Sequence, residues 1–372
     1  MHQLMYIFLF ILLGCIPTLL GFAHAAPIQY WTLEQRTPFN GKIQTSNSIH
    51  YAPLTQAKKP WRICALVPHL KDAYWIGIDY GLVSQAKQLS INLSLFEAGS
   101  YYKKSKQLKQ LEHCLSQDFD AILLGSVDPD LLKGYKAQIN KPIIALVNRL
   151  DSPVIDTRVG VNWYQMGWLA GDFIRSSLSP APLANSAPLN TTKVPSIKLA
   201  LLTGPERVGG SDWVELGILD AIANSQIDVS SIRHTDNNRD LYRDQLHNLL
   251  NDHQPDYILG SAVAIEAAVG ALQHKKLSNQ IKLVSSYLSP AVLRGIYRHK
   301  VAFSSNDQVV LQGKLAIDVI VKILEGAGPF GDIGPKIQTL IQENIQLNAL
   351  EDSLAPADFY PIYRVTNVKP RP

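Results

Sequence analysis

The stretch WRICALVPHLKDAYWIGIDYG, residues 61–81, shows most clearly how this chain folds. Residues 63–67 form a short apolar run that ends at Pro68, a pattern typical of a buried strand in a parallel sheet. Asp72 is a suitable N-cap for the helix that the next apolar residues predict. The loop between strand and helix carries Tyr74 and Trp75 as well. Since ligands of open α/β sheets bind at the carboxyl ends of strands, this loop is a candidate binding site.

Two interpretations of the loop remain open at this point. A carboxylate beside two aromatic rings suits a small cationic or methylated ligand, because the face of an aromatic ring attracts positive charge. Alternatively, Tyr74 and Trp75 only fasten the helix to the sheet, since aromatic residues near helix starts are common packing residues.

Strand and helix patterns alternate along the chain in two series, which predicts parallel sheets with right-handed crossovers. The first series predicts strands at 63–67, 92–97, 121–124 and 143–147 and helices at 75–89, 104–117 and 128–138. The second series predicts strands at 198–202, 228–234, 257–259, 282–286 and 301–304, and an extended stretch at 336–347. Its helices are expected from just after residue 162 to about 178 and at 211–224, 239–252, 262–274, 289–298 and 309–325. Two series of similar size indicate two similar α/β lobes with a cleft between them, and residues 179–196 read as a polar surface loop.

The first segment of the chain is typical of an export signal. Residues 5–22 are almost wholly apolar and the sequence AHA follows at 23–25, so residues 1–25 read as a signal peptide cleaved after Ala25. An uncleaved anchor and a lipoprotein modified at Cys15 are the alternatives, because the start of the segment has no Lys or Arg. No later apolar run is long enough to cross a bilayer, so we expect a periplasmic mature chain with no stable membrane insertion.

Two cysteines, Cys64 and Cys114, remain after cleavage. An exported protein with two cysteines is a candidate for one disulfide, although two buried thiols that pack as small hydrophobes would also fit.

Composition and motifs exclude several classes of function. The formal net charge is +4 over 372 residues without a dense Lys/Arg stripe, so no nucleic-acid partner is indicated. No nucleophile–base motif, phosphate-binding loop or metal-ligand spacing is present, so we expect no enzyme activity, no metal and no cofactor. The sequence GPERVGG at 204–210 follows a strand and precedes a helix, which favours a tight turn over an anion site. His69 and His113 read as loop and surface residues.

Aromatic residues recur where predicted strands end. Besides Tyr74 and Trp75, they include Tyr101, Trp163 and Tyr287. Rings that converge from separate strand ends can surround a methylated nitrogen cation, each contributing about 0.5–2 kcal/mol. Tyr O–H and Trp N–H groups also supply donors for an oxygen atom of the ligand. Asp72 and Asp307 stand at strand-to-helix junctions, where helix capping is the simpler explanation and does not exclude ligand contact.

Two further motifs carry a family resemblance. VNWYQMGWLAG at 161–171 and NDQVVLQGKLA at 306–316, in a chain with two α/β lobes and an export signal, resemble type I periplasmic binding proteins. LacI-type repressors share that fold, but their N-terminal helix-turn-helix is not evident here. The resemblance implies two doubly wound lobes hinged around a central cleft, joined by three crossings near Gly160, Ser305 and residue 335. It implies a segment at 26–60, an N-terminal lobe from 61–160 and 306–335, and a C-terminal lobe from 161–305 and 336–372.

A narrower resemblance lies mostly in the first lobe. CALVPHLKDAYW at 64–75, EAGSY at 97–101, SKQ at 105–107 and ILLGSVDP at 122–129 are similar to family members that detect trimethylamine N-oxide (TMAO). Those members act with the periplasmic domain of a membrane sensor histidine kinase that controls TMAO respiration genes. The resemblance implies a ligand site formed by Tyr74, Trp75, Tyr101, Trp163 and Tyr287, with Asp72 nearby, and Asp307 is a further ligand-binding candidate from its position in the chain. The alternative is a solute-binding component of an ABC importer for a sugar or autoinducer, in which Arg158 and Asp307 would serve a sugar.

Overall fold

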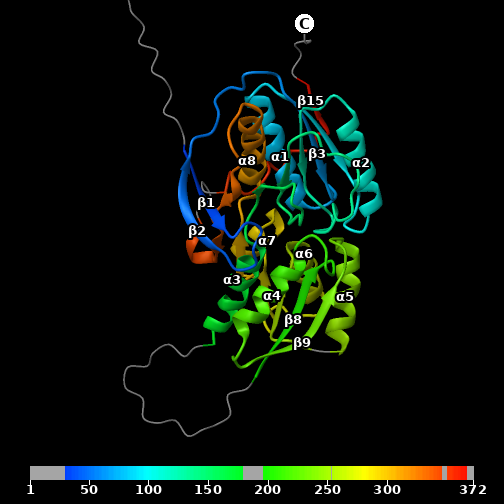
Figure 1. The fold of residues 1–372 in the computed structure, drawn as a ribbon. Coiled ribbons are helices and arrows are strands. Elements are labelled where there is room, and N and C mark those ends of the chain that lie inside the picture. The colour runs from blue at the N-terminus through cyan, green and yellow to red at the C-terminus, as the bar shows by residue number, and fades with distance from the viewer. Residues whose placement is uncertain (1–29, 179–195, 253, 346–349, 367–372) are drawn as a thin grey trace, which may run out of the picture.

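The computed structural model describes residues 30–178, 196–252, 254–345 and 350–366. The expected signal peptide and nearly all of the polar insertion at 179–196 lie outside these residues. The fold is α/β with two lobes, each built on its own sheet, which confirms the expected fold class (Figure 1). Among the described residues, no helix has the length and apolar character needed to cross a membrane.

The sheet of the first lobe has nine strands. From one edge to the other they are β15 (Arg364–Val365), β4 (Asn92–Glu97), β3 (Arg62–Val67), β5 (Ala121–Leu124), β6 (Ile143–Leu146), β7 (Thr157–Val159), β13 (Gly331–Pro335), β1 (Trp31–Thr37) and β2 (Thr45–Tyr51). Helices α1 (Ala73–Gln88), α2 (Lys104–Ser116) and α8 (Val309–Leu324) belong to this lobe. The middle strands pair in parallel and are almost fully buried, as their continuous apolar runs require.

The sheet of the second lobe has six strands. Their order is β14 (Gln338–Leu340), β12 (Phe303–Asn306), β11 (Lys282–Ser285), β10 (Tyr257–Gly260), β8 (Ile197–Gly204) and β9 (Ile227–His234). The helices are α3 (Trp163–Ser176), α4 (Ser211–Ile222), α5 (Arg239–Asp252), α6 (Ala262–His274) and α7 (Pro290–Tyr297), and a 3-10 turn, η1, covers Gln342–Asn344. The chain passes between the lobes after β7, after β12 and after β13.

Helices α1 and α8 pack so closely that their backbones touch. A Cβ on Gly81 would lie 2.1 Å from the carbonyl oxygen of Val310, and a Cβ on Gly313 would lie 2.3 Å from that of Ile78. These two glycines therefore allow α8, which enters the first lobe from the second, to lie directly against the helix that carries Tyr74 and Trp75.

The expected helix at 128–138 was wrong. The structure has turns there, because the carboxylate of Asp128 accepts a hydrogen bond from the backbone N–H of Asp130 at 2.8 Å. A carboxylate that bonds the backbone two residues on favours a turn over a helix. Gly134 then adopts a left-handed backbone with φ of 75°, which also interrupts helical geometry.

The two ends of the chain also differ from expectation. Residues 31–51 form a β-hairpin, β1–β2, that extends the first sheet. The assignment of 336–372 to the C-terminal lobe was wrong for the last described part of the chain, because β15 pairs with β4 of the first lobe and Ile362 N–H donates to Asp79 on α1 at 2.8 Å. Edge strands gain free energy by satisfying backbone groups at an open sheet edge, a driving force that a short polar sequence does not reveal.

Cys64 on β3 and Cys114 on α2 are joined by a disulfide with an S–S distance of 1.98 Å. Both residues are fully buried in a small apolar cluster. The bond ties α2 to the strand that precedes the candidate binding loop.

Candidate ligand-binding site

A small cavity of about 30 Å³ lies between the two lobes. The first lobe and the first crossing contribute four aromatic side chains and one carboxylate, and the second lobe contributes Tyr287, a glycine-rich turn and small polar residues. The lining residues are Asp72, Tyr74, Trp75, Tyr101, Trp163, Thr203, Pro205, Val208, Gly209, Ser211, Val214, Asn237, Ser261, Ser286 and Tyr287. This volume excludes drug-sized molecules, whose pockets measure roughly 300–1,000 Å³.

Tyr74 is the centre of an aromatic cluster. Its ring centroid lies 6.1 Å from that of Trp75, 6.1 Å from that of Trp163 and 5.1 Å from that of Tyr287. Trp75 donates its indole N–H to the hydroxyl of Tyr101 at 3.0 Å. All five rings are at least nine-tenths buried. The structure thus brings the five aromatic residues singled out in the sequence around one cavity, which we call the aromatic box.

The two carboxylate oxygens of Asp72 differ: one caps helix α1, and the other has no hydrogen-bond partner among the described residues. Its Oδ1 accepts the backbone N–H of Trp75 at 3.1 Å and so caps α1. Its Oδ2 is buried and has no hydrogen-bond partner among the described residues. Burial raises the pKa of Asp72, and the nearby His69 opposes that shift. An unpartnered buried carboxylate oxygen on the cavity is costly in the empty site, so a ligand that compensates it gains affinity.

Asp307 does not line the cavity. It lies behind Tyr74 and accepts the Tyr74 hydroxyl at 2.7 Å and the Gln312 side-chain amide at 3.0 Å. Burial raises the pKa of Asp307, and these two hydrogen bonds oppose the shift. Its geometry is that of a group that orients Tyr74.

The hydroxyl of Tyr287 is the second polar group of the box without a partner. It is buried and has no partner of good hydrogen-bond geometry within the part of the chain that the structure describes, and Ser261 is the polar group close enough to interact with it. Tyr287 follows β11 in the second lobe, whereas Asp72 belongs to the first. A ligand that bonds Tyr287 and contacts Asp72 would therefore connect the two lobes.

The turn at 204–210 closes the box from the second lobe. Gly209 and Gly210 adopt positive φ values of 73° and 135°. A Cβ on Gly209 would lie 2.6 Å from the ring of Tyr101, and one on Gly210 would lie 3.0 Å from the ring of Trp163. The glycines are thus required both for a tight turn, as the sequence indicated, and for close approach to two rings of the box.

We expect Gly209→Ala to weaken ligand binding about tenfold, because the methyl group must displace Tyr101 and oppose closure at a strained φ, at a cost of about 1–3 kcal/mol. Calorimetric titration of the variant checks this. Gly134→Ala is the matched control, since Gly134 has φ of 75° but nothing lies within 4 Å of an added Cβ. Equal affinities for Gly209→Ala and the wild type would exclude the turn from closure.

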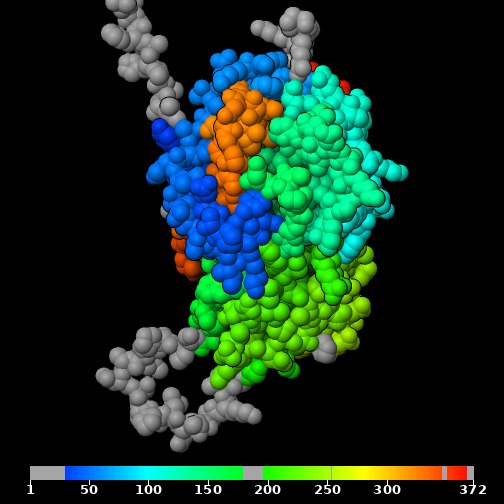
Figure 2. Space-filling model, viewed as in Figure 1, coloured from blue at the N-terminus to red at the C-terminus, as the bar shows by residue number. Residues whose placement is uncertain are grey.

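Direct contacts hold the lobes together outside the box. Ser100 Oγ in the first lobe donates to Asp236 in the second at 2.8 Å. The guanidinium of Arg149 lies 4.3 Å from the centre of the Trp213 ring across the same boundary. In the space-filling view the two lobes meet closely, and the blue hairpin reaches down to the second lobe (Figure 2).

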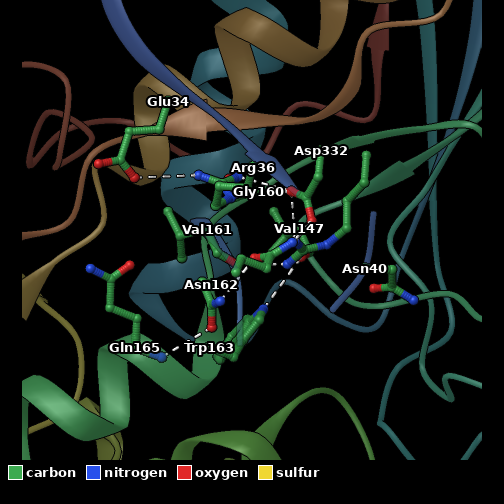
Figure 3. Close-up of polar contacts among 12 residues, drawn as sticks. Glu34, Arg36, Asn40, Val147, Gly160, Val161, Asn162, Trp163, Gln165 and Asp332 are labelled. Atoms are coloured by element: carbon green, nitrogen blue, oxygen red, sulfur yellow. Dashed lines mark hydrogen bonds and ion pairs between the residues drawn. The ribbon is translucent and has the colours of Figure 1, made fainter. Parts of the chain in front are cut away.

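A buried ionic network supports the crossing that carries Trp163 (Figure 3). Asp332 accepts hydrogen bonds from Arg36 and Arg158, both at 3.0 Å, and all three side chains are nearly fully buried. Burial opposes ionisation of Asp332, but the two guanidiniums overcome it and lower the pKa of this carboxyl. The hairpin thus supplies Arg36 to the hinge of the molecule.

The same network reaches the aromatic box through one carbonyl. Val147 has an unusual positive φ of 64°, and its carbonyl oxygen accepts Arg158 Nη2 at 2.9 Å and the indole N–H of Trp163 at 3.3 Å. A β-branched residue rarely adopts this backbone conformation, so the surrounding contacts must hold it. Arg158 is therefore engaged in positioning the hinge, and its guanidinium is not directed to a sugar.

Sequence reasoning missed several residues of the site. His69 lies in a loop as expected, but it is buried, and its ring meets that of Tyr101 edge to face at 5.3 Å. Ser261 and Ser286 line the cavity and follow β10 and β11. Their position at strand ends was the available signal, although serine there is also a common N-cap. Among the described residues, no cluster of His, Cys, Asp and Glu could hold a metal ion.

Comparisons with known proteins agree with this architecture. The periplasmic binding protein domain family matches residues 63–328. Periplasmic protein TorT of Escherichia coli O157:H7 is 35% identical over 309 residues, 83% of this chain and 86% of TorT. A solved complex of the TorS sensor domain with TorT in the absence of ligand contains a chain 36% identical, with a TM-score of 0.72, covering 81% of this chain and 100% of that one. The corresponding complex in the presence of TMAO gives 35% identity and a TM-score of 0.70, covering 82% and 99%.

An importer component is also similar. The structure of an ABC transporter solute-binding protein from Bradyrhizobium sp. BTAi1 with bound bis-tris is 31% identical, with a TM-score of 0.74, and covers 91% of this chain and 99% of that chain.

Two α/β lobes joined by three crossings, with a small cavity between them, are the architecture of a binding protein of the periplasmic type. The chain belongs to the periplasmic binding protein family, with TorT among its relatives. It is a periplasmic binding protein and not an enzyme.

Proposed function

We propose that this chain binds TMAO in the aromatic box and reports its presence to the periplasmic domain of a TorS-like sensor histidine kinase that controls TMAO respiration genes. The observation that carries the proposal is the box itself: five buried rings around a cavity of about 30 Å³, with two unpartnered polar atoms. The relative TorT has been solved in complex with the TorS sensor domain, once in the presence of TMAO. Export by a signal peptide cleaved after Ala25 would place the chain beside such a domain.

The chemistry of TMAO matches the box group by group. Its nitrogen carries a positive charge within three methyl groups, which ring faces bind through cation–π attraction. Its single oxygen carries negative charge and needs donors, and the free hydroxyl of Tyr287 is a donor at the cavity. The free Oδ2 of Asp72 provides negative charge near the methylated nitrogen. Five of the fifteen lining residues carry aromatic rings, which suit the methyl groups of TMAO, and six others are polar.

Binding would act as a population shift. A ligand that touches Asp72 from one lobe and Tyr287 from the other favours an arrangement in which the lobes are closed around it, by no more than its difference in affinity for the closed and open states. We propose that the lobes move as two bodies about the crossings and that the kinase domain recognises one arrangement.

The pH dependence of binding should report on Asp72. Because burial raises its pKa, the carboxyl of the empty site takes up a proton as the pH falls through that raised value. A ligand with a positive nitrogen favours the ionised form, so affinity is full at high pH and decreases on acidification. Asp72→Asn should bind more weakly and lose this dependence, which titrations across the pH range would show; affinity that rises on acidification would contradict the assignment.

A solute-binding role in an ABC importer is the second candidate, favoured by the similarity to the Bradyrhizobium solute-binding protein. It shares the fold and the cleft. It differs in its partner, which would be a permease, and in the expected ligand.

Calorimetry of residues 26–372 with TMAO, trimethylamine and ribose, alone and with the kinase's periplasmic domain, tests the proposal. We expect saturable TMAO binding, weaker binding of trimethylamine, which lacks the oxygen, and no binding of ribose. TMAO binding only in the presence of the kinase domain would show that the partner completes the site. Ribose binding, or no response to TMAO in either setting, would favour the importer.

A further inference from the structure

Two grooves flank helix α6 on the second lobe, away from the aromatic box. The groove between α5 and α6 has a volume of about 460 Å³, and the groove near α6 and α7 has a volume of about 410 Å³. The three helices pack side by side, with α6 between the others. Both grooves are therefore part of one continuous face, which we call the α6 face; α5 and α6 can be followed in Figure 1.

The α6 face is strongly basic. Six basic side chains line its two grooves (Arg239, Arg243, Lys275, Arg294, Arg298 and Lys300), and the acidic residues of the lining are Asp240 and Glu266. Arg239 pairs with Glu266, and Arg243 pairs with Asp240 and with Asp244 outside the lining. The formal excess of these lining residues is as large as the +4 of the whole chain. Within the described ranges, no carboxylate lies within 4.0 Å of the cationic groups of Arg294, Arg298 or Lys300. Charges that are left without local partners are available to an acidic molecule.

Apolar surface lies between these charges. Leu250, Ala267 and Ala271 form the floor of the first groove. Gly270 is exposed in the middle of α6, and nothing lies within 4 Å of the position that a Cβ would take. A groove between neighbouring helices, with an apolar floor and charged rims, suits an amphipathic segment of opposite charge.

Helix α5 connects this face with the aromatic box. Immediately before it, Asp236 accepts the interlobe hydrogen bond from Ser100, and Asn237 lines the cavity. Asn238 then caps the first turn of α5 by accepting the backbone N–H of Asp240 at 2.9 Å. A change of lobe arrangement that breaks the hydrogen bond from Ser100 therefore alters the contacts of the segment directly before α5, the helix that bears Arg239 and Arg243.

We propose that the α6 face docks an acidic, amphipathic segment of the periplasmic domain of the sensor kinase. This inference rests on the proposed function and specifies where the partner binds. The docked segment would lie along α5 and α6, where it can distinguish the closed arrangement from others through α5.

The charge test compares two triple variants in binding to the purified kinase periplasmic domain. Arg294→Glu, Arg298→Glu and Lys300→Glu together should weaken binding at least tenfold and reduce its dependence on salt. Lys87→Glu, Lys106→Glu and Lys109→Glu, which reverse three exposed charges on α1 and α2 of the first lobe, should leave it unchanged. Equal losses in both variants would show an effect of total charge and overturn the assignment of this face.

A steric variant avoids the change in charge. Gly270→Leu should block the groove and lose binding by a similar factor, while the helix is retained because leucine favours helices more than glycine does. Gly328→Leu is the control, since Gly328 is also exposed in open space but lies in the first lobe, before β13.

Titration of each variant with TMAO distinguishes a failure of the proposed docking face from a failure of the proposed sensor function. Lost kinase binding with unchanged TMAO affinity supports docking at the α6 face. Kinase binding that is equal in wild type and variants overturns the docking face and leaves the sensor function standing. A wild-type protein that does not bind the kinase domain overturns both the docking and the partner.

Discussion

Trp75→Ala is expected to abolish TMAO binding while the protein still folds. Trp75 is 1% exposed, forms one wall of the box and donates its N–H to Tyr101. Its removal deletes one cation–π face and frees Tyr101 to rotate, so the affinity should fall about 100-fold or more. The truncation also leaves a cavity beside Gly125, at a cost of about 3–5 kcal/mol in stability, which a domain with a large core tolerates.

Two control variants show whether a loss of affinity in Trp75→Ala is specific to the aromatic box. Phe303→Ala removes an equally buried ring from the core of the second lobe, where it stacks on Phe173 at 4.8 Å, so it should lower stability without loss of affinity. Trp75→Phe keeps a ring face but removes the N–H donor, so intermediate affinity is expected. Calorimetry together with circular dichroism measures all three. Undiminished affinity in a folded Trp75→Ala protein would refute the aromatic box.

Asp332→Asn is expected to lower the free energy of unfolding by about 3–5 kcal/mol, because it leaves the buried guanidinium of Arg158 without a counter-charge and leaves Arg36 with only Glu34, 3.8 Å away. Asp172→Asn is the control, since its ion pair with Arg175 is partly exposed and contributes about 1 kcal/mol or less. Denaturant unfolding at neutral pH compares the two. A similar small loss in both variants would show that the network does not stabilise the hinge.

The pH dependence of stability follows from the same carboxyl. The pKa of Asp332 is lowered in the folded protein, so its contribution is present above its usual range and is lost as the pH falls through the lowered value. Asp332→Asn should therefore flatten the acid limb of the stability curve. We also expect it to weaken ligand binding, because Arg158 and Trp163 share the Val147 carbonyl.

The sequence predicted the central architecture because the parallel strands are buried on both faces and read as unbroken apolar runs. Strand β5 was predicted at its observed residues, 121–124, for this reason. The hairpin β1–β2 and strand β15 were not recognised, because edge strands are held by backbone pairing and their side chains are largely polar or exposed. The helix expected at 128–138 did not form, because the side chain of Asp128 accepts a hydrogen bond from the backbone two residues later and so favours a turn, although the apolar residues there have helical spacing.

The sequence predicted those site residues whose location follows from their position at the end of a strand. Tyr74, Trp75, Tyr101, Trp163 and Tyr287 lie together because strand ends converge at the interlobe boundary. Asp307 shares that location, yet its carboxylate turns toward Tyr74 and Gln312, a direction that residue order does not determine. The burial of His69 and the approach of Gly209 to Tyr101 arise from packing between distant segments, which a single sequence does not encode visibly.

The most direct test of the account is a crystal structure of residues 26–372 grown with saturating TMAO. We predict one TMAO molecule between the lobes, with its methyl groups against Tyr74, Trp75 and Trp163 and its oxygen within hydrogen-bond distance of a tyrosine or tryptophan donor of the box. TMAO bound elsewhere, or a box that stays empty at saturating concentration, would contradict the central claim.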